Sequence, residues 1–334
     1  MKKTRDESGR REFLRWVSAG SLISVLIDGR VFATPASGSK SLRGIFPIAQ
    51  TPFNESGNLD LDALAEEVRF NERARAHGFV WPQNASEWKS LTERERFDGA
   101  EAIASVGKGL RPAVVIGVQA ANVATAAMYA KHAQKVGADA VISLPPENSP
   151  PNDALEYYKE LGMATDLPLI VQAVGNLSVD VILQMYMAIP TMRYVKDEAQ
   201  NPLTRIGPLR EKSSDGIRVF SGNHGRTLID EMRQGFSGSM PAASFADLYA
   251  TTWDLWQAGH HREAMAMHGK TLLILTEVDA YGFESLKYIL YLRGVFKAYG
   301  VRRLAGASPV SPLSEEGKRS IRDALDYLKP YLRA

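Results

Sequence analysis

Short apolar runs alternate with amphipathic stretches along the chain from Gly44 onward. The runs that predict strands cover residues 44–48, 79–81, 113–118, 140–144, 167–174, 192–196, 217–221 and 238–240. Each is followed by sequence with helical spacing, at intervals of roughly 25 to 30 residues. Eight such repeats predict an α/β fold, the (β/α)8 or TIM barrel. A doubly wound sheet is the alternative, although no GxGxxG sequence follows the first strand.

Several helix boundaries carry capping signals. Asp60 is placed to cap the first helix, Thr92 and Glu95 form a capping-box pattern, and Gly137 is placed to end the third helix.

The chain after Ala243 shows only helical patterning, over residues 248–258, 262–275, 284–299 and 315–332. We therefore expect a barrel over residues 40–245. Residues 246–334 are expected to form the last barrel helix and a C-terminal helical bundle.

Lys196 ends the sixth predicted strand, after an aromatic and a β-branched residue. A lysine at the carboxyl end of a barrel strand is partly desolvated, and desolvation favours the free amine that attacks a carbonyl. The alternative is a strand-end lysine that extends its ammonium group to the surface. Local sequence leaves both open.

Composition excludes several classes of site. The 334 residues carry a formal net charge of +2, which gives no reason to expect nucleic acid or an anionic membrane surface as a partner. The absence of cysteine excludes disulfides, thiolate metal sites and a cysteine nucleophile. The six histidines show no metal-ligand spacing, so we expect no metal. A lysine that forms an imine would need no organic cofactor either.

The first residues predict a targeting segment. Gly9-Arg10-Arg11-Glu12-Phe13-Leu14-Arg15 resembles a twin-arginine export motif, and a modestly apolar run follows from Trp16 to Ile27. That run is too short to anchor the protein in a membrane. Residues 1–36 are therefore expected to be an export signal and linker, with a periplasmic mature protein. The alternative is a cytoplasmic protein with a basic tail.

Short sequences distributed around Lys196 resemble the dihydrodipicolinate synthase and N-acetylneuraminate lyase family. They occur from Gly44 nearly to the C-terminus, in the order Thr51-Pro52-Phe53, Leu91-Thr92-Glu93-Arg94-Glu95-Arg96, Gly137-Ala138-Asp139-Ala140, Leu167-Pro168-Leu169-Ile170, Lys196, Ser221-Gly222-Asn223 and Ser308-Pro309-Val310-Ser311-Pro312-Leu313. The resemblance implies that Lys196 forms a Schiff base with pyruvate or another 2-oxo acid. It also implies a homo-oligomer, a dimer or a tetramer.

The loop after the second strand departs from the family. The family's Gly-Thr-Thr-Gly-Glu loop, which holds the oxo-acid carboxylate, is replaced by Gln83-Asn84-Ala85-Ser86-Glu87. Backbone donors near Ala85 and the Asn84 amide can still bind a carboxylate, although Asn84 is equally well interpreted as an ordinary turn residue. The other candidate substrate-binding residues are Glu87 in the same loop, His224 after the seventh strand, and Ser239 and Met240 in the eighth strand.

The proton carrier of the family is also replaced. Gln172 stands in the fifth strand where the family has its tyrosine, and glutamine does not transfer protons near neutral pH. Leu177 and Glu147 stand where the synthases have an arginine and a second tyrosine. The chain is therefore not expected to be a lysine-biosynthetic synthase.

A carboxylate is the hypothesis for the missing proton carrier. A glutamate in a partly dry pocket can have its pKa raised toward neutrality, and Glu147 or Glu87 could serve. The alternatives are a structural role for Glu87 and an exposed loop position for Glu147. His224, after the seventh strand, is a further candidate.

Three interpretations of function follow. The leading one is a Schiff-base lyase, an aldolase or a dehydratase, that acts on a 2-oxo acid such as pyruvate or a sugar-acid derivative. The second is a catalytically impaired family member that binds a carboxylated small molecule. The third is an unrelated barrel, in which Lys196 would point outward among the helices.

Overall fold

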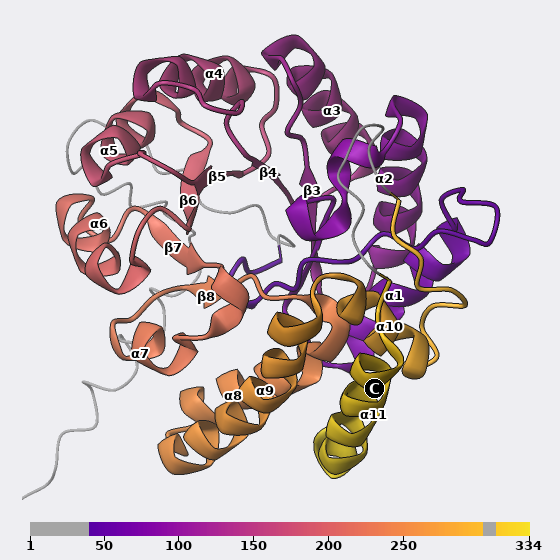
Figure 1. Cartoon of the computed structure of the whole chain (residues 1–334). Helices are drawn as coiled ribbons and strands as arrows, with labels where there is room; N and C mark the ends of the chain where they lie inside the picture. Colours follow the sequence, from indigo (N-terminus) through magenta and orange to yellow (C-terminus); the bar gives the residue numbers. More distant parts are fainter. Residues whose placement is uncertain (1–39, 303–311) are drawn as a thin grey trace, which may run out of the picture. The chain divides into compact units, whose positions relative to one another are not determined.

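The computed structural model describes residues 40–302 and 312–334; the predicted export segment lies outside them. Eight parallel strands form one sheet in the order β1-β8-β7-β6-β5-β4-β3-β2. The strands are β1 (Gly44–Ile45), β2 (Gly78–Trp81), β3 (Ala113–Gly117), β4 (Ala140–Ser143), β5 (Leu169–Ala173), β6 (Met192–Asp197), β7 (Arg218–Ser221) and β8 (Gly238–Ser239). The predicted TIM barrel is confirmed (Figure 1).

Hydrogen bonds between β1 and β2 close the sheet on itself. The His77 amide donates to Ile45 O at 2.8 Å, and the Val80 amide donates to Pro47 O at 3.0 Å. An isolated parallel bridge joins Ile48 to Val80. In the closed barrel, the carboxyl ends of the strands form a ring at one end, which is where barrel enzymes place their active sites.

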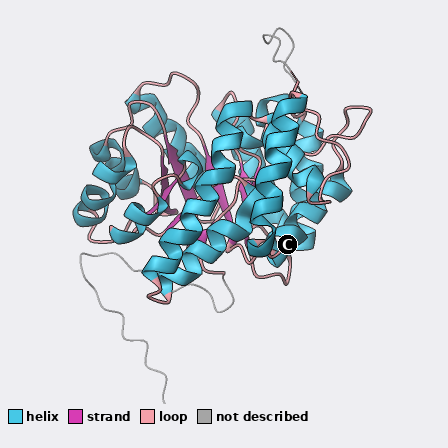
Figure 2. Ribbon diagram, turned by 60° about the horizontal axis from the view of Figure 1, so that its bottom comes forward, coloured by secondary structure: helices cyan, strands magenta, loops and turns pink. Residues whose placement is uncertain are grey.

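Helices surround the strands on the outside, as Figure 2 shows. Those of the barrel are α1 (Leu61–Arg73), α2 (Glu93–Gly107), α3 (Val123–Val136), α4 (Pro151–Met163), α5 (Val179–Ala188), α6 (Ile206–Lys212), α7 (Leu228–Arg233) and α8 (Ala246–Gln257). The predicted caps are confirmed: Asp60 accepts from the Ala63 amide, and Thr92 and Glu95 form a capping box.

Side chains alternate between two apolar clusters along each strand. On β4, Ala140 and Ile142 pack in the inner cluster with Phe46 and Phe220, whereas Val141 packs in the outer cluster against the helices. This alternation fixes which strand residues can reach the central pocket.

Three further helices follow α8: α9 (His261–Tyr281), α10 (Glu284–Leu292) and α11 (Glu315–Leu328). The helix predicted over 284–299 is wrong beyond Leu292, because Gly294 adopts a left-handed conformation with φ 72° and reverses the chain. In the described part of the chain, no helix is long and apolar enough to cross a membrane.

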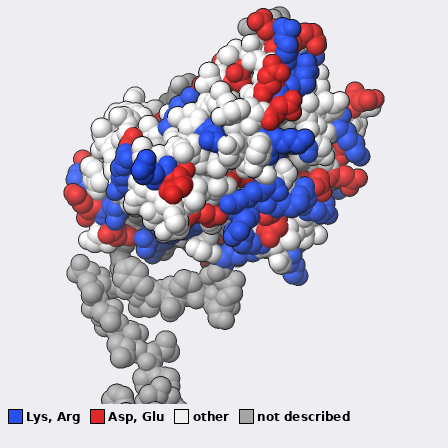
Figure 3. All heavy atoms as spheres, turned by 90° about the horizontal axis from the view of Figure 1, so that it is seen from below, with Lys and Arg blue, Asp and Glu red and all other residues white. Residues whose placement is uncertain are grey.

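Charges of both signs are interspersed on the surface. On the face drawn in Figure 3, lysine and arginine side chains lie beside aspartates and glutamates. Surface charges of the described residues form pairs such as Arg94–Asp98 at 2.8 Å and Lys212–Asp180 at 2.9 Å. Pairs of this kind contribute little to stability but keep the local field small.

Candidate active site

Lys196 lies inside the barrel near the carboxyl end of β6. Tyr194, two residues earlier on the same face, packs against the inner cluster, whereas Val195 belongs to the outer one. The Lys196 side chain is only 6% exposed. The interpretation as an unrelated barrel, with Lys196 pointing outward among the helices, is therefore wrong.

Glu198 is the group that meets the lysine. Its Oε2 lies 3.0 Å from Lys196 Nζ and accepts a hydrogen bond from Gln172 Nε2 at 2.5 Å. Its Oε1 accepts from the Asn223 amide at 3.2 Å. Gly222 permits this approach, because a Cβ at that position would stand 1.8 Å from Glu198 Oε1.

Strand register explains why Gln172 and Lys196 meet at one carboxylate. The two residues are direct partners across β5 and β6, so their side chains point into the barrel at the same height. Glu198 follows the end of β6, and its amide donates to Ala173 O at 2.9 Å, which prolongs the pairing by one residue. Sequence reasoning missed Glu198, although it stands two positions after the lysine.

Burial alone would raise the pKa of Glu198. The Lys196 charge and the hydrogen bonds from Lys196, Gln172 and Asn223 outweigh that effect and hold its pKa below the ordinary value of 4.5. The carboxylate is thus ionised beside an ammonium group. Its proton affinity depends directly on the charge of the lysine nitrogen.

These groups face a pocket of about 430 Å³, called here the lysine pocket. Its lining comprises Ile48, Gln83, Asn84, Ala85, Gln172, Lys196, Glu198, Asn223, His224, Met240, Pro241, Ala242 and Phe283. Six of the nine predicted site residues are among them. The lining is rich in amides, Glu198 is its one carboxylate, and it holds no arginine and no tyrosine.

Asn84 and Ala85 form part of one wall. They belong to a 3-10 turn, η2 (Asn84–Ser86), here called the substrate turn. Within the described part of the chain, neither the Asn84 nor the Ala85 amide has a hydrogen-bond acceptor. Two free backbone donors beside a buried lysine suit the carboxylate of an oxo acid.

Glu87 follows the substrate turn but does not line the lysine pocket. Its carboxylate forms an ion pair with the buried Lys287 of α10, and its Oε2 accepts from the Arg302 amide at 2.7 Å. Burial raises the pKa of Glu87, with the two cations acting against it. These contacts favour the structural role for Glu87 over the role of proton carrier.

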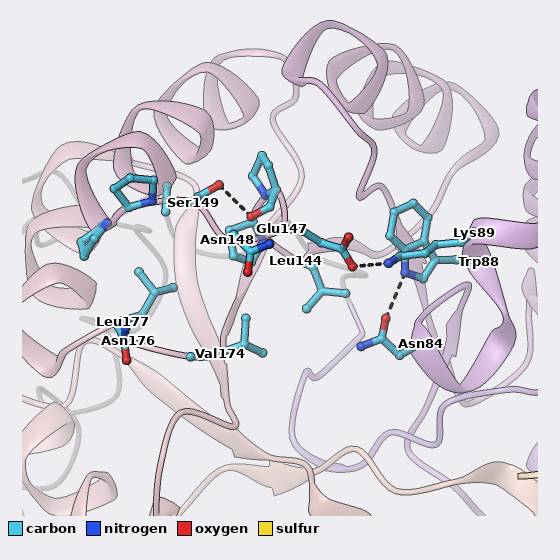
Figure 4. Close-up of a pocket in the computed structure, with 16 residues that line it drawn as sticks. Asn84, Trp88, Lys89, Leu144, Glu147, Asn148, Ser149, Val174, Asn176 and Leu177 are labelled. Atoms are coloured by element: carbon cyan, nitrogen blue, oxygen red, sulfur yellow. Dashed lines mark hydrogen bonds and ion pairs between the residues drawn. The ribbon is translucent and has the colours of Figure 1, made fainter. Parts of the chain in front are cut away.

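Glu147 lies over a neighbouring cavity of about 720 Å³, called here the outer cavity. Its side chain is 72% exposed and pairs with Lys89, as Figure 4 shows. Asn84 lines both cavities, and Trp88 Nε1 donates to its Oδ1 at 3.0 Å. Leu177 lines the outer cavity as well. Within one chain, Glu147 therefore lies outside the lining of the lysine pocket.

The remaining candidates divide between the pocket wall and its support. His224 and Met240 line the lysine pocket, and burial lowers the pKa of His224. Ser239 is fully buried outside the lining, where its hydroxyl accepts from Ser221 Oγ at 3.2 Å. Phe283, from the loop between α9 and α10, is a wall residue that the sequence did not indicate.

Two observations bear on cofactors and family. Among the described residues, no cluster of three or more histidines or carboxylates could hold a metal ion. Residues 41–328 match the model of the dihydrodipicolinate synthetase family, which is most of the chain. The chain belongs to this family. The resemblance carried by the short sequences around Lys196 is thereby confirmed.

Individual relatives are distant, and they differ in activity. The chain is 27% identical to an L-2-keto-3-deoxyarabonate dehydratase of Azospirillum brasilense, over 82% of this chain and 89% of the relative. It is 28% identical to a 4-hydroxy-tetrahydrodipicolinate synthase of Gluconacetobacter diazotrophicus, over 82% and 93%. Identity alone thus does not separate a dehydratase from a synthase.

The fold is shared with solved family members. The structure of YagE, an Escherichia coli K12 prophage protein of the dihydrodipicolinic acid synthase family solved with pyruvate, aligns with a TM-score of 0.78. The alignment covers 86% of this chain and 99% of that protein, at 20% identity. The chain is a lyase of this family.

Proposed function

We propose that this lyase forms an imine between Lys196 and a 2-oxo acid, with Glu198 as the proton carrier in place of the family tyrosine. The observation that carries the proposal is the 3.0 Å contact between Lys196 Nζ and Glu198 Oε2 inside the lysine pocket. The amine attacks the oxo carbon, water leaves, and the resulting imine accepts electrons from the adjacent carbon. The substrate turn binds the carboxylate.

Glu198 is suited to move protons during these steps. Its pKa is held down by the Lys196 ammonium charge. When the lysine nitrogen becomes neutral, as in the carbinolamine that precedes the imine, the carboxylate loses that stabilisation and becomes a stronger base. Gln172 keeps the carboxylate oriented through its hydrogen bond to Oε2.

The position of Glu198 favours dehydration over aldol cleavage. A carboxylate in contact with the lysine nitrogen reaches the hydrogen on carbon 3, next to the imine carbon, before it reaches a hydroxyl on carbon 4. Proton loss from carbon 3 yields an enamine. The enamine then expels the carbon 4 hydroxyl, which leaves as water after protonation, and the unsaturated imine is hydrolysed to regenerate the lysine.

The lining residues indicate the substrate class. Because the described residues that line the lysine pocket include no arginine, a second carboxylate would have no guanidinium partner among them. The amides of Gln83, Asn84 and Asn223 suit hydroxyl groups, which both donate and accept hydrogen bonds. We therefore propose a 3-deoxy-2-oxo sugar acid with a neutral hydroxylated tail as the substrate.

Borohydride trapping tests the imine. The folded protein is incubated with pyruvate or with one of a panel of 3-deoxy-2-oxo sugar acids, and borohydride is added to reduce any imine. Adducts are then located by intact mass and peptide mapping. We expect an adduct on Lys196 and none in Lys196→Arg. No adduct with any acid would contradict the proposal and favour a protein that binds a carboxylated molecule without catalysis. Release of water without carbon–carbon cleavage, followed by NMR, distinguishes dehydratase from aldolase.

We also propose that residues 1–36 direct export to the periplasm, on the strength of Arg10-Arg11 and the apolar run after them. Fusion of residues 1–40 to a reporter tests this. The reporter should reach the periplasm, and replacement of both arginines by lysine should retain it in the cytoplasm. A wild-type fusion that stays cytoplasmic would contradict the proposal. Assembly into a homo-oligomer likewise stays a prediction.

A further inference from the structure

The barrel itself holds Ser86, the last residue of the substrate turn. Ser86 Oγ donates to Ala49 O at 2.5 Å, and Thr51 Oγ1 donates to Ser86 O at 2.5 Å. The Gln83 amide donates to Ser86 Oγ at 2.9 Å. These bonds involve residues of the first and second barrel units only. They fix Ser86 but not the residues that follow it.

The residue that follows the substrate turn has an unfavourable backbone conformation. Glu87 has φ 55°, in the left-handed region that non-glycine residues seldom adopt. Such a residue persists when surrounding contacts hold it. The Glu87 backbone bonds locally to Asn84 and Ser90, whereas the contacts of its side chain come from the far end of the chain, through Lys287 and Arg302.

Lys287 is a buried cation whose partners are few. Its side chain is 0% exposed, it pairs with Glu87, and its Nζ donates to Gly300 O at 2.9 Å. The ring of Phe53 lies under Nζ at 4.5 Å from its centroid. A buried cation in this setting needs the Glu87 carboxylate, so the two residues hold each other in place.

Arg302 joins the same carboxylate to three more segments. Its guanidinium forms a bidentate pair with Glu95, with both contacts at 2.7 Å, and donates to Ser90 O at 3.0 Å and Gly57 O at 2.6 Å. The Arg302 amide contacts Glu87 across 215 positions in sequence. The loop after β1, the substrate turn and the start of α2 thus meet at one residue from the C-terminal region.

We propose that Lys287 and Arg302 are positioning residues, which act through Glu87 to hold the substrate turn in the form that binds the oxo-acid carboxylate. They touch neither the lysine pocket nor its contents, because neither is among its lining residues. The C-terminal helical region would thereby set the affinity for the substrate. The part that concerns the carboxylate rests on the proposed function of the turn.

The test compares variants of the full chain for adduct formation with pyruvate. Lys287→Met and Glu87→Gln should raise the half-saturating pyruvate concentration for Lys196 labelling by about tenfold, a loss of one modest binding interaction. The labelling rate at saturating pyruvate should stay within about threefold. Arg302→Lys, which keeps the charge but loses the bidentate pair with Glu95, should give an intermediate shift.

A matched control separates positioning from general stability. Asp247 and Arg293 form another buried ion pair beside the C-terminal helices, at 2.7 Å, with no contact to the substrate turn. Asp247→Asn should lower the melting temperature as Lys287→Met does, yet leave the half-saturating concentration unchanged. An equal shift in Asp247→Asn, or no shift in Lys287→Met, would overturn the proposal.

Hydrogen–deuterium exchange without pyruvate makes the outcome independent of imine chemistry. The peptide over residues 83–90 should exchange faster in Lys287→Met and Glu87→Gln than in the wild type, and at the wild-type rate in Asp247→Asn. Unchanged exchange in both Lys287→Met and Glu87→Gln would overturn the positioning role. If the wild type gives no adduct but exchange follows the expected pattern, the proposed function fails, whereas the positioning of the substrate turn by Lys287 and Arg302 stands.

Discussion

Gln172 and Lys196 are neighbours across two barrel strands, and both donate to the same oxygen of Glu198. The distances to Glu198 Oε2 are 2.5 Å from Gln172 Nε2 and 3.0 Å from Lys196 Nζ, so one carboxylate oxygen is the shared acceptor of both side chains. The glutamine in place of the family tyrosine thus orients a carboxylate, which is the proton carrier of the proposed mechanism.

Glu198→Gln should lower turnover sharply and should slow imine formation without preventing it. The amide keeps the size of the side chain but cannot accept a proton, and loss of a general base costs about 100- to 10,000-fold in kcat. Glu147→Gln is the matched control, because Glu147 is exposed and pairs with Lys89 outside the lysine pocket. Steady-state kinetics and borohydride trapping measure both. Equal losses in the two variants would contradict the assignment.

Gln172→Met should shift the pH dependence of the reaction. Lys196 and the Gln172 hydrogen bond both hold the pKa of Glu198 below 4.5, so the acid limb of kcat/KM in the wild type should lie below pH 4.5. Removing the Gln172 donor raises the pKa of Glu198 and moves that limb to higher pH. If the acid limb of kcat/KM stays at the same pH in Gln172→Met, a group other than Glu198 determines it.

The same depressed pKa fixes the sign of one contribution to stability. Because folding lowers the pKa of Glu198, its ionised form stabilises the fold above the unfolded value of about 4.5, and that stabilisation is lost as the pH falls through the folded value. In Gln172→Met the loss should begin at a higher pH. Urea unfolding between pH 3 and 6 measures the difference.

Phe283→Ala should weaken substrate binding with little change in kcat. The ring lines the lysine pocket from the loop between α9 and α10, far from the barrel strands in sequence. It is 37% exposed, so its loss should leave the free energy of unfolding nearly unchanged. We expect KM to rise by about 3- to 10-fold, on the scale of a partly buried apolar contact. An unchanged KM would place the substrate elsewhere in the pocket.

The barrel was predictable because periodicity is a local property. Alternation along the strands and the helix caps at Asp60 and Thr92 are carried by neighbouring residues, so the sequence indicated both correctly. Lys196 was found for the same reason, as the end of an apolar run. The early end of α10 at Leu292 depends on the left-handed conformation of Gly294, and a glycine permits that conformation without requiring it.

The site was less predictable because its contacts are long-range. Glu198 meets Gln172 across 26 positions, and Glu87 meets Arg302 across 215. Glu198 stands two positions after Lys196, unlike Glu147, but only the strand register brings Gln172 to the same carboxylate. Free carboxylates in loops acquire their roles from the fold, not from their neighbours in sequence.

Asp197→Asn should destabilise the protein strongly, although Asp197 never enters the lysine pocket. Its side chain is 0% exposed, and its Oδ2 lies 2.7 Å from Arg205 Nε, whose side chain is only 6% exposed. Removing the anion leaves a buried guanidinium without its partner, which costs about 3–5 kcal/mol. Urea unfolding measures the loss.

Asp180→Asn is the matched control for that experiment. Asp180 pairs with Lys212 at 2.9 Å on the surface, with side chains 75% and 54% exposed, and such a pair contributes at most about 1 kcal/mol. Arg205 also donates to Leu177 O at 2.8 Å, so its displacement should reach the loop after β5. Because Asp197 lies between Lys196 and Glu198, we expect its loss to slow imine formation as well. Equal stability of the two variants would contradict the structural role assigned to the Asp197–Arg205 pair.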